Sequence, residues 1–230
     1  MRDQRSEGIR RSWNTNASAW IGAVREGRIE SRVRVTDRAI LDAVLVRPPH
    51  RVLDLGCGEG WLCRALAERG IDTVGVDAAL PLVDAARQAG SGDYRCLPYD
   101  VLAAREDLGV FDVVVCNFSL LEEALSPVLN GIRARLADDG RLVIQTVHPR
   151  QASRDVPGRD GWRTERFDAI GRGFTERMPW YYRTRAAWID TLSAHGWQLV
   201  SMTEPARPDT GEPVSLLIEC VAGAVTEASV

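Results

Sequence analysis

The sequence predicts an α/β fold built on a mostly parallel sheet. Along its 230 residues, short apolar segments alternate with segments in which apolar residues recur every three or four positions, the patterns of strands and helices taken in turn. Two segments, FDVVVCN and RLVIQTV, are largely continuous apolar runs, as expected of strands that helices cover on both faces. A turn with three glycines follows the first strand, where the backbone can approach a ligand closely.

Seven strands are expected along the chain. They are set by apolar or alternating segments between turn residues, at 52–55, 73–76, 93–97, 111–117, 141–147, 198–203 and 214–221. The last two are joined by ARPDTGEP, a connection with proline and glycine that is compatible with an antiparallel pair. The other strands alternate with helices, which favours parallel pairing.

Helices are expected between these strands. Their apolar residues recur at three- and four-residue spacing around 62–66, 82–86, 125–136 and 188–192. Pro81 suits a first helical turn. The glycines that stand where a helix would end in a left-handed residue are Gly70, Gly90, Gly140 and Gly196.

Two segments fall outside this alternation, and the length of the chain suits a single domain, 1–230, that includes both. Residues 1–47 are predicted to form an N-terminal helical cap segment, with Ile40 and Val44 on one face of a helix that RPPH ends. Residues 149–183 are rich in arginine, glycine and aromatic residues, without clear period. Because loops of this length are usually lids or binding segments, we expect an aromatic cap insertion here; a plain surface excursion is the alternative.

The composition argues against several kinds of partner. The formal net charge is −3, so no overall positive field attracts nucleic acid or an acidic membrane. No apolar run approaches the roughly 18 residues of a membrane span, and MRDQRSEGIRRSW lacks the apolar region of a secretory signal. The cysteines form no C-x-x-C pair, and the histidines show no ligand spacing. We therefore expect a cytoplasmic protein with reduced thiols, no metal, no nucleic-acid partner and no membrane partner.

The stretch RVLDLGCGEGWLCRALAERGIDTVGVD carries the strongest functional signal. Gly56, Gly58 and Gly60 let the backbone turn sharply after the first strand, before a helix that begins near Trp61. Asp77 ends the next strand, where a carboxylate can accept hydrogen bonds from both hydroxyls of a ribose. Either feature alone occurs in many α/β proteins, but the two together at this spacing predict a nucleoside-binding βαβ unit.

The glycine spacing also selects among nucleoside ligands. A dinucleotide fingerprint requires G-x-G-x-x-G, whereas this loop is G-x-G-x-G and Trp61 stands in place of that third glycine. The loop also lacks the Lys-Ser/Thr pair of a P-loop. A nicotinamide-dependent oxidoreductase and a nucleoside triphosphatase are therefore both disfavoured.

Four motifs in series resemble those of a known family. VLDLGCGEG, VGVDAA, FDVVVCNFSLL and LADDGRLVIQTVHP are similar to segments of the class I S-adenosylmethionine-dependent methyltransferases, and the layout is closest to small stand-alone members of the ubiquinone-biosynthesis-like type. The resemblance covers residues 51–147 and, more loosely, the C-terminal helix–strand–strand segment. It implies a Rossmann-like sheet of seven strands in the order 3-2-1-4-5-7-6, with the last strand antiparallel and helices on both faces. It also implies S-adenosylmethionine as cofactor and S-adenosylhomocysteine as product.

The resemblance further implies roles for individual residues. The glycine loop would face the methionine part of the cofactor with Asp54 below it, Asp77 would bind the ribose, and Ala78 would lie beside the adenine. Asn117 and Phe118 would line the floor beneath the sulfonium. The cofactor-binding residues expected on this basis are Asp54, Gly56, Cys57, Gly58, Gly60, Asp77, Ala78, Tyr99, Asn117 and Phe118.

Few residues need take part in the chemistry, because a sulfonium methyl is already activated by its positive charge. The protein has to align the nucleophile, exclude water and remove a proton where the acceptor carries one. His148 follows the strand 141–147 at the ligand-facing edge, which makes it the candidate general base; the alternative is a side chain that caps the strand and holds the Pro149 turn. Cap aromatics could roof the acceptor or form a small core, and those expected at the substrate are Trp13, Trp180, Tyr181 and Tyr182.

The sequence favours methyl transfer to a small-molecule acceptor. NFSLL lacks the Pro-Pro-aromatic run that methyltransferases acting on exocyclic base amines usually show, and the chain has no basic stripe. A regulatory protein that binds the cofactor without turnover is the alternative. Oxygen, nitrogen, carbon and sulfur are all compatible acceptor atoms at this point.

Overall fold

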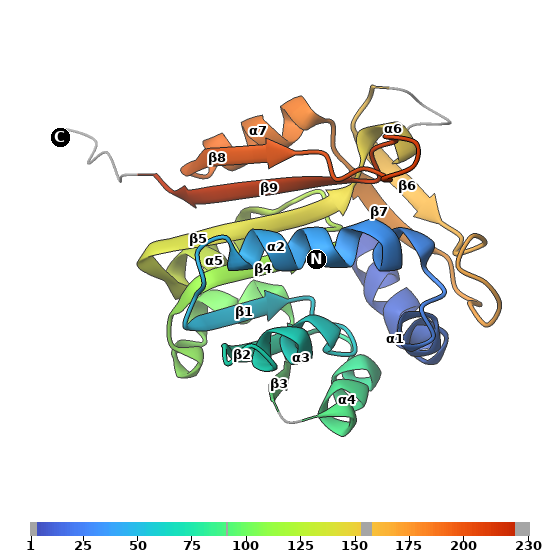
Figure 1. Cartoon of the computed structure of the whole chain (residues 1–230), viewed down its shortest axis with the longest axis horizontal. Coiled ribbons are helices and arrows are strands. Elements are labelled where there is room, and N and C mark those ends of the chain that lie inside the picture. Colours follow the sequence, from blue (N-terminus) through green and yellow to red (C-terminus); the bar gives the residue numbers. More distant parts are fainter. Residues whose placement is uncertain (1–3, 91, 153–157, 224–230) are drawn as a thin grey trace.

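A seven-stranded sheet forms the centre of the molecule (Figure 1). In the computed structural model, which describes residues 4–90, 92–152 and 158–223, the strand order is β3-β2-β1-β4-β5-β9-β8. Neighbouring strands are parallel except around β9, which is antiparallel to β5 and β8. The predicted fold class and order are therefore confirmed, with β8 and β9 as the sixth and seventh strands of the sheet. Their limits are β1 Arg51–Leu55, β2 Asp72–Asp77, β3 Asp93–Cys96, β4 Phe111–Asn117, β5 Leu136–Val147, β8 Trp197–Thr203 and β9 Ser215–Ala222.

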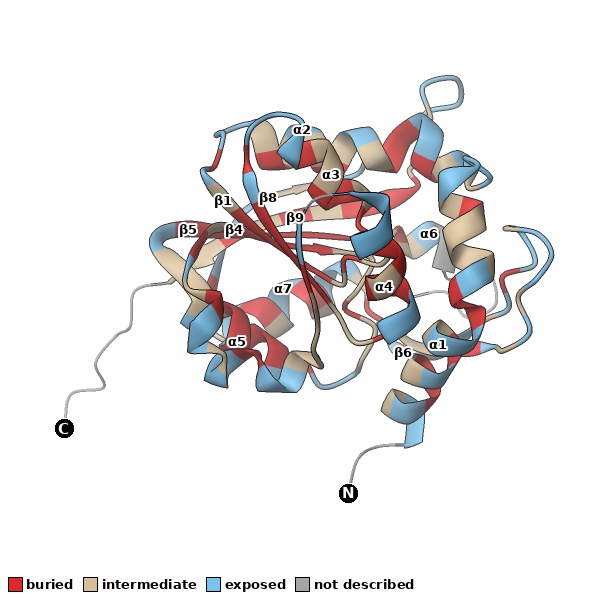
Figure 2. Cartoon of the chain, turned by 90° about the horizontal axis from the view of Figure 1, so that it is seen from below, coloured by how far each residue is buried: buried red, intermediate tan, exposed pale blue. Residues whose placement is uncertain are grey.

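Helices cover both faces of the sheet, as the continuous apolar strands require. On one face, α2 (Asp37–Leu45) and α3 (Trp61–Ala67) share a hydrophobic cluster with β1, β4 and β5. On the other face, α5 (Ser126–Arg135) and α7 (Arg185–Ala194) belong to a second cluster with the same sheet. Figure 2 shows that the buried residues of these helices lie toward the strands. The remaining helical segments of the main body are α4 Leu80–Ala89, α6 Pro149–Ala152, the 3-10 turns Tyr99–Ala104 and Glu106–Leu108, and the π-helical turn Arg32–Thr36.

The two segments outside the alternation meet beyond the carboxyl ends of the central strands. Helix α1 (Gln4–Arg25) contacts α4 and β7, and β6 (Gly161–Glu165) pairs antiparallel with β7 (Met178–Tyr182) in a separate two-stranded sheet. Both lie on the right-hand side of Figure 1. The sequence did not predict β6 and β7. β6 carries glycine and arginine, β7 carries a proline, and both pack within the cap rather than in the main core, so they show no regular apolar period.

Three of the four predicted helix-ending glycines follow a helix, and one lies elsewhere. Gly70 and Gly196 have φ angles of +77° and +73° and end α3 and α7 as expected. Gly90 ends α4 as expected, but its φ of 172° is extended rather than left-handed backbone. Gly140 lies inside β5, which begins at Leu136 rather than near residue 141. A Cβ at Gly140 would lie 2.7 Å from Leu136 Cγ, so this bend of β5 requires a residue without a side chain.

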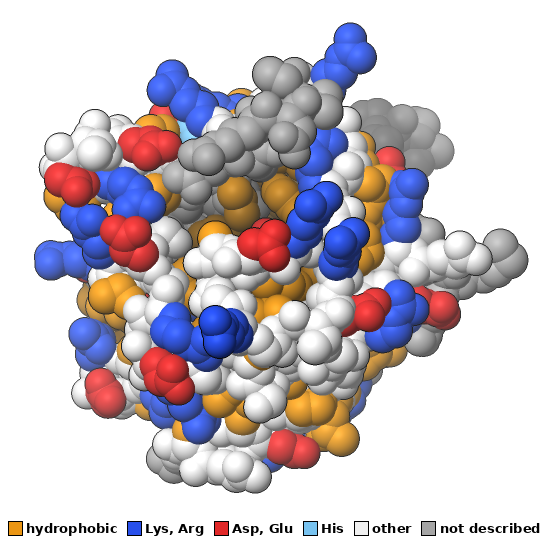
Figure 3. All heavy atoms as spheres, turned by 90° about the vertical axis from the view of Figure 1, so that its right-hand side faces the viewer, with side chains coloured by type: hydrophobic (Ala, Val, Ile, Leu, Met, Phe, Trp, Pro, Cys, Tyr) orange, Lys and Arg blue, Asp and Glu red, His pale blue; other side chains and the backbone are white. Residues whose placement is uncertain are grey.

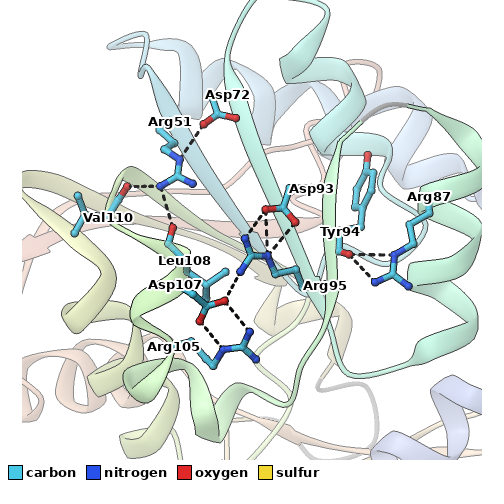
Figure 4. Close-up of polar contacts among 10 residues, drawn as sticks. All are labelled: Arg51, Asp72, Arg87, Asp93, Tyr94, Arg95, Arg105, Asp107, Leu108 and Val110. Carbon is cyan, nitrogen blue, oxygen red and sulfur yellow. Dashed lines mark hydrogen bonds and ion pairs between the residues drawn. The ribbon is translucent and has the colours of Figure 1, made fainter.

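Arginines fix the outer edge of the sheet (Figure 4). Arg95 of β3 donates hydrogen bonds to Asp93 and to Asp107, and Asp107 also pairs with Arg105. Arg51 of β1 pairs with Asp72. These contacts join the first three strands to the 3-10 turns that follow β3, at a distance from the cap.

Among the residues that the structure describes, no helix is long and apolar enough to cross a membrane. In that same part of the chain, no group of three or more histidine, cysteine, aspartate or glutamate side chains is arranged to hold a metal ion.

Candidate active site

A cavity of about 850 Å³ lies between the carboxyl ends of the sheet strands and the cap. Figure 3 views the molecule from the side of α1 and the cap, where hydrophobic side chains are visible in a central hollow with charged side chains around it. The glycine loop, the ends of β2, β4 and β5, helix α1 and the β6–β7 hairpin all contribute to its lining. The predicted site residues that line the cavity are Asp54, Gly56, Cys57, Gly58, Asp77, Ala78, Tyr99, Asn117, Phe118, Trp13 and Trp180.

The three loop glycines have different surroundings. A Cβ at Gly56 would lie 2.2 Å from Ser119 Cβ and 2.7 Å from Tyr99 Oη, so this residue is pressed against the end of β4. A Cβ at Gly58 would meet only Trp20 Nε1, at 3.8 Å, so Gly58 faces the open cavity. Gly60 packs away from the cavity, since a Cβ there would lie 2.8 Å from the Tyr94 ring, and it is not among the lining residues. Only the first two glycines are therefore placed to contact a ligand.

Asp77 lies at the end of β2 as the sequence predicted, and its carboxylate orders the loop. Its Oδ2 accepts a hydrogen bond from the Gly58 amide and its Oδ1 accepts one from the Ala79 amide, both at 2.9 Å. Burial raises the pKa of Asp77, and these amide hydrogen bonds oppose that rise. Each oxygen keeps a further lone pair for a ligand hydroxyl.

Two buried side chains beside the loop, an aspartate and an arginine, each keep one polar atom that has no partner among the described residues. Asp54 is 2% exposed, and its Oδ1 has no hydrogen-bond partner among the described residues. Arg32 is 8% exposed; its Nε donates to Asp37 Oδ1 at 2.9 Å and its guanidinium lies 4.8 Å from the Trp61 ring centre, but its Nη2 has no partner there either. Burial raises the pKa of Asp54 to about 7. Because unpaired buried polar atoms are costly, this pair suits a ligand that carries both charges.

The β6–β7 hairpin presents one of its faces to the cavity. Glu165, Met178 and Trp180 lie on the face that lines it, whereas Trp162 and Tyr181, paired across the strands, lie on the opposite face. Opposite this wall, Trp13 of α1 contacts Phe167 edge to face, with ring centres 6.2 Å apart. The end of the cavity under the cap is therefore largely aromatic.

Two lining phenylalanines have left-handed backbone. Phe118 follows β4 with a φ of +55°, and Phe167 follows β6 with a φ of +62°. Glu165 holds the second of these turns, since its Oε1 accepts hydrogen bonds from the amides of Arg166 and Phe167 at 2.8 and 2.6 Å. Such backbone is strained in residues other than glycine and concentrates at functional sites.

Four predicted site residues do not line the cavity: Gly60, His148, Tyr181 and Tyr182. Tyr181 packs edge to face on Trp162, and Tyr182 is buried beneath Trp180. His148 is 3% exposed; its Nδ1 accepts a hydrogen bond from the Arg150 amide at 3.2 Å. Its Nε2 lies 3.3 Å from Glu204 Oε1 but makes no hydrogen bond with the described residues. This contact with Arg150 is the one expected of the strand-capping alternative.

Sequence reasoning missed several lining residues. Glu165, Phe167 and Met178 all line the cavity, and none was assigned to the site; Trp20 and Arg32, which the sequence marks only as an aromatic that could roof a pocket and an arginine that could bind a carboxylate, line it as well. The aromatic character of their segments was a signal for the cap as a whole. Trp180 and Tyr181 lie on opposite faces of the hairpin because they are consecutive residues of strand β7. The sequence did not predict this strand, because the segment has no clear apolar period.

Buried polar contacts hold α1 over the site. Asn16 is fully buried: its Nδ2 donates to Glu176 O at 2.6 Å and its Oδ1 accepts from the amides of Thr175 and Glu176. At the other end of α1, Arg25 pairs with the buried Glu59 of the glycine loop at 3.0 Å. These contacts tie the N-terminal helix both to the cap insertion and to the loop.

Comparisons with known proteins agree with this architecture. A family model described as a methyltransferase domain matches residues 29–202. The ubiquinone biosynthesis O-methyltransferase of Bordetella avium is 42% identical over 106 residues, 43% of this chain and 43% of that protein. The protein of the same name from Xanthomonas campestris pv. campestris (strain B100) is 36% identical over 118 residues, 47% of this chain and 48% of that protein. The chain thus matches less than half the length of these curated relatives.

Solved structures show the same fold. The S-adenosylmethionine dependent methyltransferase from Mesorhizobium loti is 22% identical, with a TM-score of 0.58 over 79% of this chain and 97% of that chain. The 1,6-didemethyltoxoflavin-N1-methyltransferase of Burkholderia thailandensis is 21% identical, with a TM-score of 0.64 over 97% of this chain and 92% of that chain. Because the family model covers most of the sheet and the segment that carries Arg32, this chain belongs to the methyltransferase domain family.

Proposed function

We propose that this protein transfers a methyl group from S-adenosylmethionine to a small organic acceptor bound beneath the cap, and that residues 1–230 act as one domain. The observation that carries the proposal is that Asp54 Oδ1 and Arg32 Nη2, beside the glycine loop, have no partner in the part of the chain that the structure describes. An α-amino and an α-carboxylate group would satisfy both atoms, and the methionine end of S-adenosylmethionine carries these two groups.

The other cavity residues fit the rest of the cofactor. Gly58 leaves room for close approach, and Asp77 lines the cavity with carboxylate oxygens that can accept hydrogen bonds from ribose hydroxyls. Ala78 and Tyr99 line the neighbouring wall, where a flat base would pack. Cys57 also lines the cavity; burial raises the pKa of its thiol, so it stays neutral beside the ligand.

The bound cofactor supplies a methyl group on a positively charged sulfur, which is activated without help from the protein. The residues of this chain then have to hold the acceptor in line with that methyl and to exclude water. The aromatic cap suits both tasks. Where the acceptor carries a proton, the titratable side chains that line the cap end of the cavity are Glu122 and Glu165, since the chain contains no lysine and His148 does not line the cavity.

A small acceptor is supported by the size of the cavity beneath the cap, about 850 Å³, and by one structural neighbour. That neighbour, from Burkholderia thailandensis, is described with bound 1,6-didemethyltoxoflavin and S-adenosylhomocysteine. The curated relatives named above are O-methyltransferases and this neighbour methylates a nitrogen, so the comparisons leave both acceptor atoms open.

Calorimetry with S-adenosylhomocysteine tests the proposal. We expect one binding site in the wild-type protein, weakened about tenfold or more by Arg32→Met or Asp54→Asn, because each change removes a charged hydrogen bond. Tyr181→Phe, outside the cavity, is the control and should leave the affinity unchanged. No binding by the wild-type protein would overturn the proposed function, and unchanged affinity in both variants would overturn the placement of the methionine end.

A further inference from the structure

A directional chain of hydrogen bonds ends at Asn117, the last residue of β4. Gln145 of β5 is 1% exposed, and its Nε2 donates to Asn117 Oδ1 at 2.9 Å and to the backbone carbonyl of Thr36 at 3.0 Å. Its Oε1 accepts a hydrogen bond from Ser215 Oγ at 3.1 Å. Every polar atom of the Gln145 side chain therefore has a partner.

The direction of this chain is fixed by its chemistry. The Thr36 carbonyl can only accept, so the end of the Gln145 amide that faces Thr36 must be the nitrogen. The same nitrogen faces Asn117, which must therefore present its oxygen to Gln145. A reversed Asn117 amide would place two N–H groups against each other.

The nitrogen of Asn117 is consequently left for the cavity. Asn117 lines the cavity, and within the described part of the chain no residue accepts a hydrogen bond from its Nδ2. Phe118, whose amide is bonded to Gln145 O at 2.7 Å, continues the same wall. At the end of β4, Asn117 therefore offers the cavity its Nδ2 hydrogen-bond donors, whereas its Oδ1 acceptor is directed to Gln145.

We propose that Asn117 donates a hydrogen bond to the acceptor atom, that Gln145 is the residue that positions it, and that the site selects an ionisable oxygen over an amine. The inference rests on the proposed function. An oxygen nucleophile has a lone pair for the methyl group and another for Asn117, whereas a neutral amine has one lone pair, which the reaction uses. An amine would also bring its own N–H groups against those of Asn117.

A matched pair of probes tests this polarity in the S-adenosylhomocysteine complex of the full chain. 4-Nitrophenol and 4-nitroaniline have the same shape but differ in whether the substituent accepts or mainly donates hydrogen bonds. At a pH where the phenol is largely ionised, we expect the wild-type protein to bind 4-nitrophenolate about tenfold more tightly or better, as one charge-assisted hydrogen bond allows. The absorbance of the phenolate should persist to a lower pH when it is bound.

Asn117→Asp reverses the polarity without removing the contact with Gln145. One carboxylate oxygen can still accept from Gln145, and the other then faces the cavity as an acceptor. We expect the preference for 4-nitrophenolate to vanish or reverse, with S-adenosylhomocysteine affinity unchanged within about twofold. Asn130→Asp, the same chemical change on the exposed face of α5, is the control and should keep the wild-type preference. If the Asn117→Asp protein does not fold, Asn117→Ala decides, because it should bind both probes equally.

Several results would overturn the inference while the proposed function stands. For the wild-type protein, these results are equal affinity for the two probes or binding of neither probe. For Asn117→Asp, they are a preference that survives the change, or a loss of S-adenosylhomocysteine affinity of about tenfold or more. That last result would assign Asn117 to the cofactor. Failure of the wild-type protein to bind S-adenosylhomocysteine would instead overturn the proposed function.

Discussion

Gly56, Gly58 and Gly60 have φ angles of +92°, +56° and +83°, values that favour glycine over any residue with a side chain. Their neighbours give each a separate reason to be glycine: Ser119 presses on the first, the cavity opens before the second, and Tyr94 covers the third. The spacing in the sequence predicted the turn. Which glycine meets the ligand depends on β3 and β4, which pack against the loop from distant parts of the chain.

Substitutions at Gly58 and Gly60 distinguish a glycine that contacts the ligand from one that packs against neighbouring side chains. Gly58→Val should leave a folded protein that no longer binds S-adenosylhomocysteine, because the branched side chain would occupy the cavity at a strained backbone position. Gly60→Ala should instead lower the melting temperature, because its Cβ would lie within 2.9 Å of Ala86 and Tyr94. Calorimetry and thermal melts of both variants check this pair. Wild-type affinity in Gly58→Val would show that this glycine does not approach the ligand.

Asp54 should make cofactor binding depend on pH. The folded protein holds the Asp54 proton up to a pH of about 7, whereas the unfolded chain releases it at the lower, ordinary pKa of an aspartate. Ionisation of Asp54 therefore lowers the free energy of unfolding of the ligand-free protein as the pH rises toward 7. A cationic amino group beside Asp54 would offset this cost, so binding should be tighter at pH 8 than at pH 6, by about tenfold for one pKa unit.

Calorimetry in buffers of different ionisation enthalpy measures how many protons are released when the ligand binds. We expect S-adenosylhomocysteine to release close to one proton at pH 6 and almost none at pH 8. Asp54→Asn should bind more weakly and lose this part of the pH dependence. Equal wild-type affinity at both values of pH, with no proton release, would contradict the assignment of Asp54 to the amino group.

Among the elements of the cap, a few buried polar contacts act beside a small apolar cluster built around Ile9, Phe167 and Met178. Asn16 makes its hydrogen bonds to the backbone at 175–176 from the middle of α1, and Arg183 donates from the end of β7 to the carbonyls of Glu122 and Glu123. The hairpin and α1 therefore form one layer with the loop that follows β4. This arrangement explains how segments without a clear apolar period become ordered.

Asn16→Ala should loosen this layer. The change leaves the backbone amides of Thr175 and Glu176 without their acceptor, which costs about 1–3 kcal/mol of unfolding free energy, whereas Glu176 O keeps its hydrogen bond from Ser12 Oγ. Asn14→Ala removes one exposed hydrogen bond, to Arg10 O, and should cost less than about 0.5 kcal/mol. Denaturant unfolding of the two variants gives the comparison. Equal stability of the two would show that the Asn16 contacts do not hold α1 in place.

His148 lies at the junction of β5 and α6. If it holds the turn through Arg150, His148→Asn should keep most of the stability and activity, because an amide oxygen can also accept that hydrogen bond, whereas His148→Ala should lose about 1 kcal/mol. A fall of about 10²–10⁴-fold in turnover in both variants, with intact cofactor affinity, would restore the general-base prediction.

For the molecule as a whole, the sheet could be predicted from the sequence because its strands are buried on both faces. FDVVVCN and RLVIQTV leave few alternatives to a central strand, and the glycine turn and Asp77 identify the ligand edge. Arg32 could not be assigned in this way. Its place beside Asp54 results from the packing of the segment 29–36 against β5, a contact between distant parts of the chain that no local pattern encodes.

A crystal structure of the S-adenosylhomocysteine complex tests the central claim most directly. We expect the amino group at Asp54 Oδ1, the carboxylate at Arg32 Nη2, the ribose at Asp77 and the sulfur directed toward the space between Asn117 and Trp180. A ligand bound elsewhere, or bound in this cavity with Asp54 Oδ1 and Arg32 Nη2 still unpaired, would contradict it.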